Sequence, residues 1–369
     1  LAKEELDCLY EQAKFQPIIG NLKDEGRQPE WAKSYLIHRT KAGTNIAFLA
    51  YTFPYYITYA PNGWQVLEPM ARLEEDLARP EVKDADIVVV LSHLGVRYDE
   101  QIAETYPQVN LVIGSHTHHL FEEGKLVNET YLAAADRYGY YLGCIDLTVE
   151  NGRLIECQIE AIPTKSYILD LDKEDETFIK AMREEGHRRL AQKKVANLGR
   201  ELDFDETCQL VLQAVCQETD SQLTLLNTGL IMKTLGPQVT MADLQEALPH
   251  QMRMARLVVT GQELKEICQE VFTKAELLKN QAIKGMGFRG KTFGEVITGN
   301  FAYKNGNLLY NRRVVDSNEK FSLVLVDQYY FASYFPTIKE KEVTLLFPDL
   351  LRELVAKYLG KNGANWDKI

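Results

Sequence analysis

The sequence predicts an α/β protein, with a parallel sheet in its first half and a second α/β domain after it. Consecutive Val, Ile and Leu residues at 87–91 and 111–113 are typical of strands covered on both faces, as in parallel sheets. Residues 99–105 predict a helix between these two strands, and this β-α-β order favours parallel pairing. Beyond residue 198, helix-capping patterns alternate with apolar strands, which indicates the second domain.

The other elements of the first half follow from hydrophobic periodicity and turn residues. Asn151-Gly152 is a strong hairpin signal between two strands. We expect helices at 1–14 and 69–77, and strands at 15–19, 34–40, 45–51, 131–135, 140–149 and 153–162.

The second half contains helix starts in which an acid follows a capping residue by three positions. The three pairs are Asp203 with Glu206, Thr240 with Asp243, and Thr260 with Glu263. We expect strands at 223–226 and 257–259, mostly strand over 293–326, and a closing helix at 348–359.

The chain divides into residues 1–165, a connecting helix at 166–195, and residues 196–369. The stretch 170–195 is the most charged part of the sequence and has only a thin apolar stripe. Such a stripe is typical of a solvated helix, so we place the domain boundary there.

Composition excludes some classes of partner. The net charge of −11 argues against a nucleic acid polymer, because binding to one depends on a basic surface. No apolar run approaches the ~20 residues that span a membrane. The six cysteines show no C-x-x-C spacing, which favours buried free thiols and a cytoplasmic location. The sequence does not indicate the oligomeric state.

Histidines cluster where the two predicted parallel strands end. His93 follows the first strand, and His116 and His118 follow the second. Ligands bind outside the carboxyl ends of strands in open α/β sheets, and imidazole commonly binds divalent metals, so these residues are candidate metal ligands. A histidine that only caps a loop is the alternative for each one alone. The aromatic segment 53–56 could line a pocket mouth or pack beneath a loop.

The pairing of SHLG at 92–95 with GSHTH at 114–118 resembles the calcineurin-like metallophosphoesterases, in the branch of 5'-nucleotidases and 2',3'-cyclic nucleotide phosphodiesterases. The resemblance implies the end of an α-β-β-α metallophosphoesterase sandwich over residues 1–165. It also implies two divalent ions (manganese, zinc, iron or magnesium), with His93 and His116 on one ion and His118 on the other.

The second half resembles the 5'-nucleotidase C-terminal domain in its blocks at 225–229, 239–250 and 259–264. This resemblance implies that residues 196–369 bind a small-molecule nucleotide substrate. Asn227 would contact the base or ribose, with His250 beside it, and Tyr329, Tyr330 or Phe331 would stack on the base. Core packing is the alternative for these aromatics. Arg289, in a glycine-rich basic turn at 284–291, is a candidate phosphate contact or a surface residue.

The chain also departs from the family. The earlier metal-binding blocks, which contain Asp-x-His, Gly-Asp and Gly-Asn-His-Glu, are missing between Leu1 and Leu91, and the chain starts without Met. We therefore expect a fragment of a metal-dependent phosphoesterase of nucleotide catabolism, with no catalytic residue of its own and little activity. The alternative is a module that binds a nucleotide or sugar phosphate without hydrolysing it.

Overall fold

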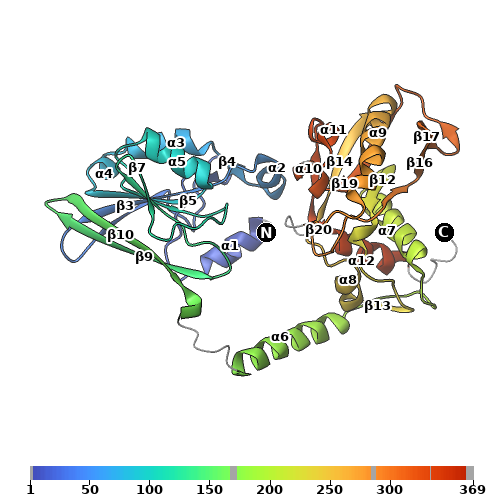
Figure 1. The fold of residues 1–369 in the computed structure, drawn as a ribbon, viewed down its shortest axis with the longest axis horizontal. Coiled ribbons are helices and arrows are strands. Elements are labelled where there is room, and N and C mark those ends of the chain that lie inside the picture. Colours follow the sequence, from blue (N-terminus) through green and yellow to red (C-terminus); the bar gives the residue numbers. More distant parts are fainter. Residues whose placement is uncertain (1–2, 167–172, 284–287, 333, 363–369) are drawn as a thin grey trace. The chain divides into compact units, whose positions relative to one another are not determined.

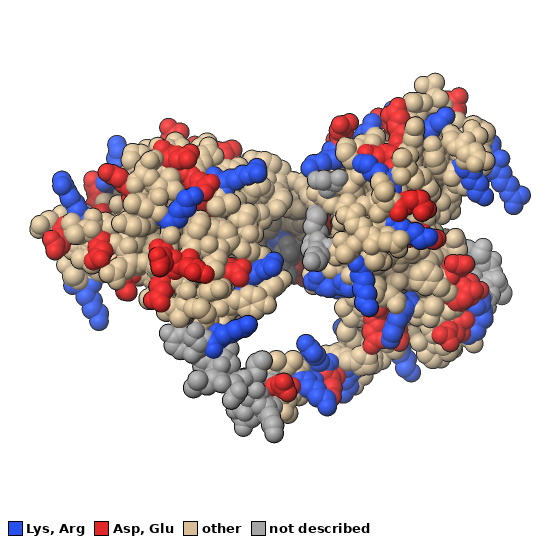
Figure 2. All heavy atoms as spheres, viewed as in Figure 1, with Lys and Arg blue, Asp and Glu red and all other residues tan. Residues whose placement is uncertain are grey.

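A computed structural model describes residues 3–166, 173–283, 288–332 and 334–362. The chain forms two compact units, Leu1–Asp172 and Lys173–Ile369, and each is described by itself (Figure 1). No helix in the described ranges has the length and apolar content needed to span a bilayer. On the face of each unit seen in Figure 2, acidic and basic side chains are interspersed.

The first unit is built around a six-stranded sheet of order β2-β3-β5-β6-β8-β7. The two histidine strands are β5 and β6; they pair in parallel with Val89 opposite Leu111, which confirms the predicted pairing. The described strands of this unit are β1 Leu22–Lys23, β2 Tyr35–Arg39, β3 Asn45–Thr52, β4 Gln65–Val66, β5 Ile87–His93, β6 Leu111–Gly114, β7 Lys125–Val127, β8 Thr130–Ala133, β9 Tyr141–Glu150 and β10 Arg153–Pro163.

Helices cover one face of this sheet and a β-hairpin covers the other (Figure 1). Val88, Val90 and Val112 pack against the helical face. Ile87 and Val89 face the β9–β10 hairpin, because alternate strand residues point to opposite faces. The helices are α1 Lys3–Glu11, α2 Tyr56–Tyr59, α3 Pro69–Leu77, α4 Pro80–Lys83 and α5 Val96–Thr105.

Two local predictions in this unit, the hairpin at Asn151-Gly152 and the strand at 15–19, have different outcomes. Asn151 and Gly152 both have positive φ, at 50° and 73°, and they join β9 to β10 as predicted. The strand predicted at 15–19 is wrong: only Ile18 forms an isolated bridge, to Lys33. Pro17 lies within this segment, and proline cannot donate to a strand ladder. Pro17 itself contributes only its carbonyl, which accepts from Lys33 N–H.

The second unit contains a five-stranded sheet of order β15-β12-β19-β14-β20. All three predicted capping boxes are present, at the starts of α7, α8 and α9. The predicted closing helix begins later, at Leu351, because residues 348–350 complete β20. The elements of the second unit are α6 Lys173–Ala191, β11 Lys194–Asn197, α7 Phe204–Glu218, β12 Leu223–Asn227, the 3₁₀ turn η3 Thr228–Leu230, β13 Gln238–Thr240, α8 Met241–Ala247, β14 Arg253–Thr260, α9 Gly261–Leu278, β15 Val296–Gly299, β16 Phe301–Lys304, β17 Asn307–Tyr310, β18 Arg313–Val314, β19 Lys320–Val326, α10 Gln328–Phe331, α11 Pro336–Lys339, β20 Thr344–Leu350 and α12 Leu351–Asn362. The 3₁₀ turns η1 Ala60–Asn62 and η2 Thr164–Ser166 belong to the first unit.

Three of the six cysteines are buried. All six are free, and Cys208, Cys216 and Cys268 are buried in the second unit. Cys8 and Cys144 are exposed and Cys157 is intermediate, so the expectation that most are buried is wrong for the first unit. Cys144 lies on the open face of β9, where alternate residues stay accessible, and Cys8 lies on α1, which has no buried residue.

Candidate metal centre

The parallel register brings two histidines to one edge of the sheet. His93 is the last residue of β5, and Ser92 lies opposite Gly114 at the end of β6. After β6 ends at Gly114, one residue, Ser115, leads to His116 at the carboxyl edge of the sheet. The two residues are 23 positions apart in sequence, yet the sheet places their rings in contact, with centroids 4.9 Å apart.

Two ring nitrogens of this pair converge. His93 Nε2 lies 3.3 Å from His116 Nδ1. Imidazole nitrogens bind divalent transition metals at about 2.0–2.1 Å, so two ligands of one tetrahedral ion lie about 3.3 Å apart. The spacing of these two donors therefore fits a shared divalent ion.

The outward nitrogens of both rings have their own partners. His93 Nδ1 lies 2.7 Å from Ser115 Oγ, and His116 Nε2 lies 3.3 Å from Tyr55 Oη. Phe53 stacks on the His116 ring, with centroids 5.1 Å apart and planes at 17°. From the sequence, this aromatic segment is expected to line a pocket mouth or to pack beneath a loop. In the structure, Phe53 and Tyr55 pack against the ring of His116, a candidate metal ligand. The signal that could have located the aromatic segment was its position immediately after β3, which neighbours β5.

Both histidines are favoured in the neutral form that binds metal. Partial loss of solvent lowers the pKa of His93, and the nearby His116 and His118 lower it further. The pKa of His116 is lowered in the same way, by loss of solvent and then by His118. A neutral imidazole keeps a lone pair, so neither ring needs to release a proton at neutral pH before binding an ion.

His118 does not complete a set of three ligands. Its side chain is exposed, and both it and His116 have positive φ, at 51° and 63°. Within the described residues, no three His, Cys, Asp or Glu side chains gather as a metal site. The structure thus brings His93 and His116 together and leaves His118 nearby at the surface.

A buried carboxylate supports the base of the site. Asp99, only 1% exposed at the start of α5, accepts a hydrogen bond from Ser92 Oγ next to His93. Burial raises the pKa of Asp99 to about 6. Glycine is required at position 114, because a Cβ there would lie 2.4 Å from Asp99 Oδ2. The GSH motif is therefore also a packing motif.

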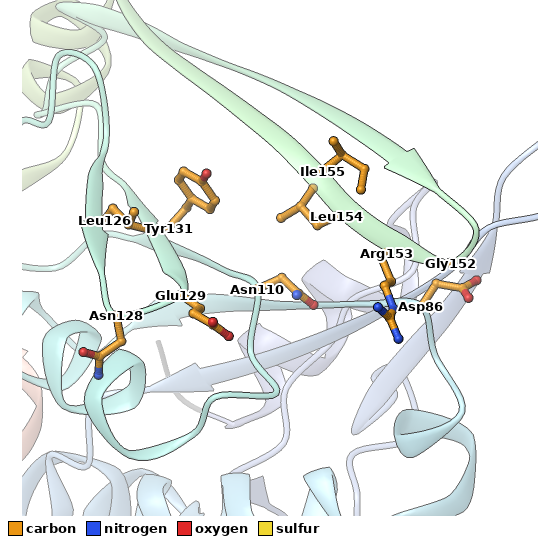
Figure 3. Close-up of a pocket in the computed structure, with 10 residues that line it drawn as sticks. All are labelled: Asp86, Asn110, Leu126, Asn128, Glu129, Tyr131, Gly152, Arg153, Leu154 and Ile155. Atoms are coloured by element: carbon orange, nitrogen blue, oxygen red, sulfur yellow. The ribbon is translucent and has the colours of Figure 1, made fainter.

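A separate hollow of about 460 Å³ lies at the opposite, amino-terminal ends of these strands (Figure 3). Asp86 and Asn110 line it immediately before β5 and β6. Their carboxylate and amide oxygens accept from the backbone N–H groups of Asn45 and Val88, at 2.7 and 2.8 Å. These side chains fix strand register, so the histidine edge remains the better candidate for chemistry.

In the second unit, the residues expected to contact a nucleotide are mostly buried. Asn227 is fully buried at the end of β12: its amide donates to Phe293 O, and its Oδ1 accepts from Tyr329 Oη at 2.6 Å. Tyr329 is itself 1% exposed and packs on Phe293. Phe331, at the end of α10, is half-buried. The side-chain polar atoms of Asn227 and Tyr329 are thus hydrogen-bonded to each other and to the backbone.

His250 anchors the loop that carries Arg289. The imidazole is 1% exposed, stacks on Phe288 and accepts the Arg289 backbone N–H at 2.8 Å. Burial lowers the pKa of His250 to about 4. The Arg289 side chain is exposed, whereas residues 284–287 of the glycine-rich turn lie outside the described residues.

Comparison with known proteins decides the family. No protein-family model matches the sequence. The chain is 33% identical to the uncharacterised metallophosphoesterase YunD of Bacillus subtilis over 377 aligned positions, which cover 96% of this chain and 80% of YunD. The chain belongs to the metallophosphoesterases.

Solved structures agree with this assignment at the level of fold. A candidate 5'-nucleotidase from Staphylococcus aureus, solved with alpha-ketoglutarate, superposes with a TM-score of 0.63 at 13% identity and covers 99% of this chain and 79% of its own. The NAD nucleotidase of Haemophilus influenzae gives a TM-score of 0.59 at 14% identity over 98% of this chain and 79% of its own. Metallophosphoesterases use divalent metal ions, which is consistent with the paired imidazole donors at the ends of β5 and β6.

Proposed function

We propose that this metallophosphoesterase acts on nucleotide-type phosphate esters, as a 5'-nucleotidase or a cyclic nucleotide phosphodiesterase, through a divalent metal centre held in part by His93 and His116. The observation that carries the proposal is the 3.3 Å approach of His93 Nε2 to His116 Nδ1 at the carboxyl edge of parallel strands. The names of the Staphylococcus and Haemophilus neighbours support a nucleotide substrate.

The chain's own residues have distinct parts in this function. His93 and His116 would hold an ion from one side, and His118 would reach a second ion from the loop. When bound, such ions polarise a phosphoryl oxygen and lower the pKa of a bound water. In the second unit, Arg289 is the candidate with an exposed side chain, so we assign it the contact with the negatively charged part of the substrate.

We also propose that residues 1–369 turn over substrate slowly by themselves. The sequence contains no Asp-x-His, Gly-Asp or Gly-Asn-His-Glu block before SHLG, so it lacks the bridging carboxylate and the catalytic histidine that these blocks supply in the family it resembles. Imidazole-rich ligation favours manganese, zinc or iron over magnesium.

Two measurements test these proposals. Calorimetric titration of the metal-free chain with Mn²⁺ or Zn²⁺ should show binding that His116→Ala abolishes, and full-affinity binding by that variant would contradict the metal centre. Phosphate release from AMP and from 2',3'-cyclic AMP with Mn²⁺ then reports activity. Tight nucleotide binding without metal and without product would instead identify a non-catalytic binding module.

A further inference from the structure

Tyr55 occupies a position that can decide which nitrogen of His116 carries its proton. A neutral imidazole protonates one nitrogen and offers a lone pair on the other, and the partner of the first fixes the choice. The His116 ring has Tyr55 Oη 3.3 Å from Nε2 and His93 Nε2 3.3 Å from Nδ1. The tautomer of this one residue therefore determines whether its lone pair faces the other histidine.

Tyr55 is held at this position by the backbone. A buried amide, that of Asn21, pairs with both backbone groups of Thr52, the last residue of β3, at 2.9 and 2.8 Å. The following N–H, from Phe53, donates to the carbonyl of His93 at 2.9 Å. A tight turn then returns Tyr55 N–H to Phe53 O, also at 2.9 Å. The segment is thus tied to the same strand end that carries His93.

Ring contacts fix the plane of His116 from two sides. Phe53 lies nearly parallel to the imidazole, and Tyr55 meets its edge with centroids 5.7 Å apart and planes at 64°. Phe53 and Tyr55 also contact each other, at 4.6 Å. Rotating the ring out of this plane would lose these contacts, and a 180° flip within the plane would put ring carbons in place of the nitrogens that face His93 and Tyr55.

We propose that Tyr55 is a positioning residue that, when a divalent ion is bound, holds His116 as the Nε2–H tautomer, with the Nδ1 lone pair directed toward the ion shared with His93. In this arrangement His116 Nε2–H donates to Tyr55 Oη, and His93 Nδ1–H donates to Ser115 Oγ. Ser115 Oγ can accept both bonds, because a hydroxyl oxygen accepts up to two hydrogen bonds and the other one comes from His116 N–H. The inference rests on the proposed metal centre for its purpose.

Tyr55→Phe tests the proposal because it removes the hydroxyl and keeps the ring. Long-range ¹H–¹⁵N spectra of the Zn²⁺-loaded chain, assigned with His116→Ala, should show His116 protonated on Nε2 in the wild type, and this Nε2 proton should exchange with water faster in Tyr55→Phe. Zn²⁺ affinity, measured by calorimetry, should fall about tenfold, the lower end of what losing an outer hydrogen bond to a metal-binding histidine costs. Tyr56→Phe, at the exposed neighbouring tyrosine, should change neither.

The outcomes separate this proposal from the metal centre itself. His116 protonated on Nδ1 in the Zn²⁺-loaded wild type would overturn the assignment of Tyr55, as would an unchanged exchange rate of the Nε2 proton in Tyr55→Phe. A loss of Zn²⁺ affinity without faster exchange of the Nε2 proton would also overturn it, because Tyr55 would then act directly on the ion. Failure of the wild-type chain to bind Zn²⁺ would instead contradict the metal centre, whatever the tautomer.

Discussion

Two histidine sites in this chain show how differently the same side chain can be used. His93 and His116 lie at the open carboxyl edge of a parallel sheet, with one nitrogen of each ring facing the other ring. His250 lies in the core of the second unit, where it anchors a loop through its Nδ1. The comparison teaches that a ligand site needs donor atoms that folding leaves available, whereas polar atoms already paired in the core contribute to stability.

The largest expected effect is on metal affinity in the first unit. His93→Ala should weaken Zn²⁺ binding by at least about 100-fold, close to 3 kcal/mol, because it removes one of two converging donors. The same change should alter the free energy of unfolding by less than about 0.5 kcal/mol, since the side chain is exposed. Calorimetry and urea unfolding measure the two quantities. A large loss of stability with unchanged zinc binding would show that the pair is structural.

The second-largest expected effect is a pH dependence of the free energy of unfolding of the second unit. His250 has a pKa near 4 in the folded chain and an ordinary value near 6.5 when unfolded, so the unfolded state binds more protons between these values. Stability is therefore present above about pH 6.5 and is lost as the pH falls toward 4, by about 2 kcal/mol between pH 7 and pH 5.

Urea unfolding at pH 5 and pH 7 measures this dependence of the free energy of unfolding, and pulsed hydrogen exchange at β12 reports the unfolding of the second unit. His250→Asn is the comparison. The variant should lose about 2 kcal/mol less over the same interval. The carboxyl of Asp327, whose pKa burial raises to about 6, is common to both chains and cancels in the difference. Equal pH profiles would show that His250 does not stay neutral in the core.

The third effect concerns the buried tyrosine. Tyr329→Phe should lower the free energy of unfolding by about 1–2 kcal/mol, because Asn227 Oδ1 would remain buried without its donor. Tyr330→Phe is the matched control, since Tyr330 is only half-buried on the same short helix. A smaller loss in Tyr329→Phe than in the control would argue that Asn227 is accessible and available to a ligand after all.

The smallest effect on stability is expected for Arg289→Ala. The backbone N–H of Arg289, not its side chain, makes the bond to His250, so unfolding should change by less than about 0.5 kcal/mol. Under the proposed function the same variant should weaken nucleotide binding, measured by calorimetry in the presence of Mn²⁺. Unchanged nucleotide affinity would remove Arg289 from the proposed substrate site.

Local sequence signals predicted the framework of the site, and tertiary contacts supplied the rest. The apolar runs before His93 and His116 predicted β5, β6 and their shared edge, because continuous burial leaves few alternatives. The partner of His116 could not be predicted, since Tyr55 arrives from β3, 61 residues away in sequence. Sequence also could not show that Asn227 and Tyr329 satisfy each other across 102 residues.

The register of β5 against β6 has a consequence for how this centre tolerates insertions. Each histidine is placed by its count from a strand end, so α5 and its flanking loops could lengthen without displacing either ring. A single residue added between Gly114 and His116 would instead move the His116 imidazole away from its position opposite His93. Homologues are therefore expected to vary freely in the spacer and to keep the short step from strand to ligand.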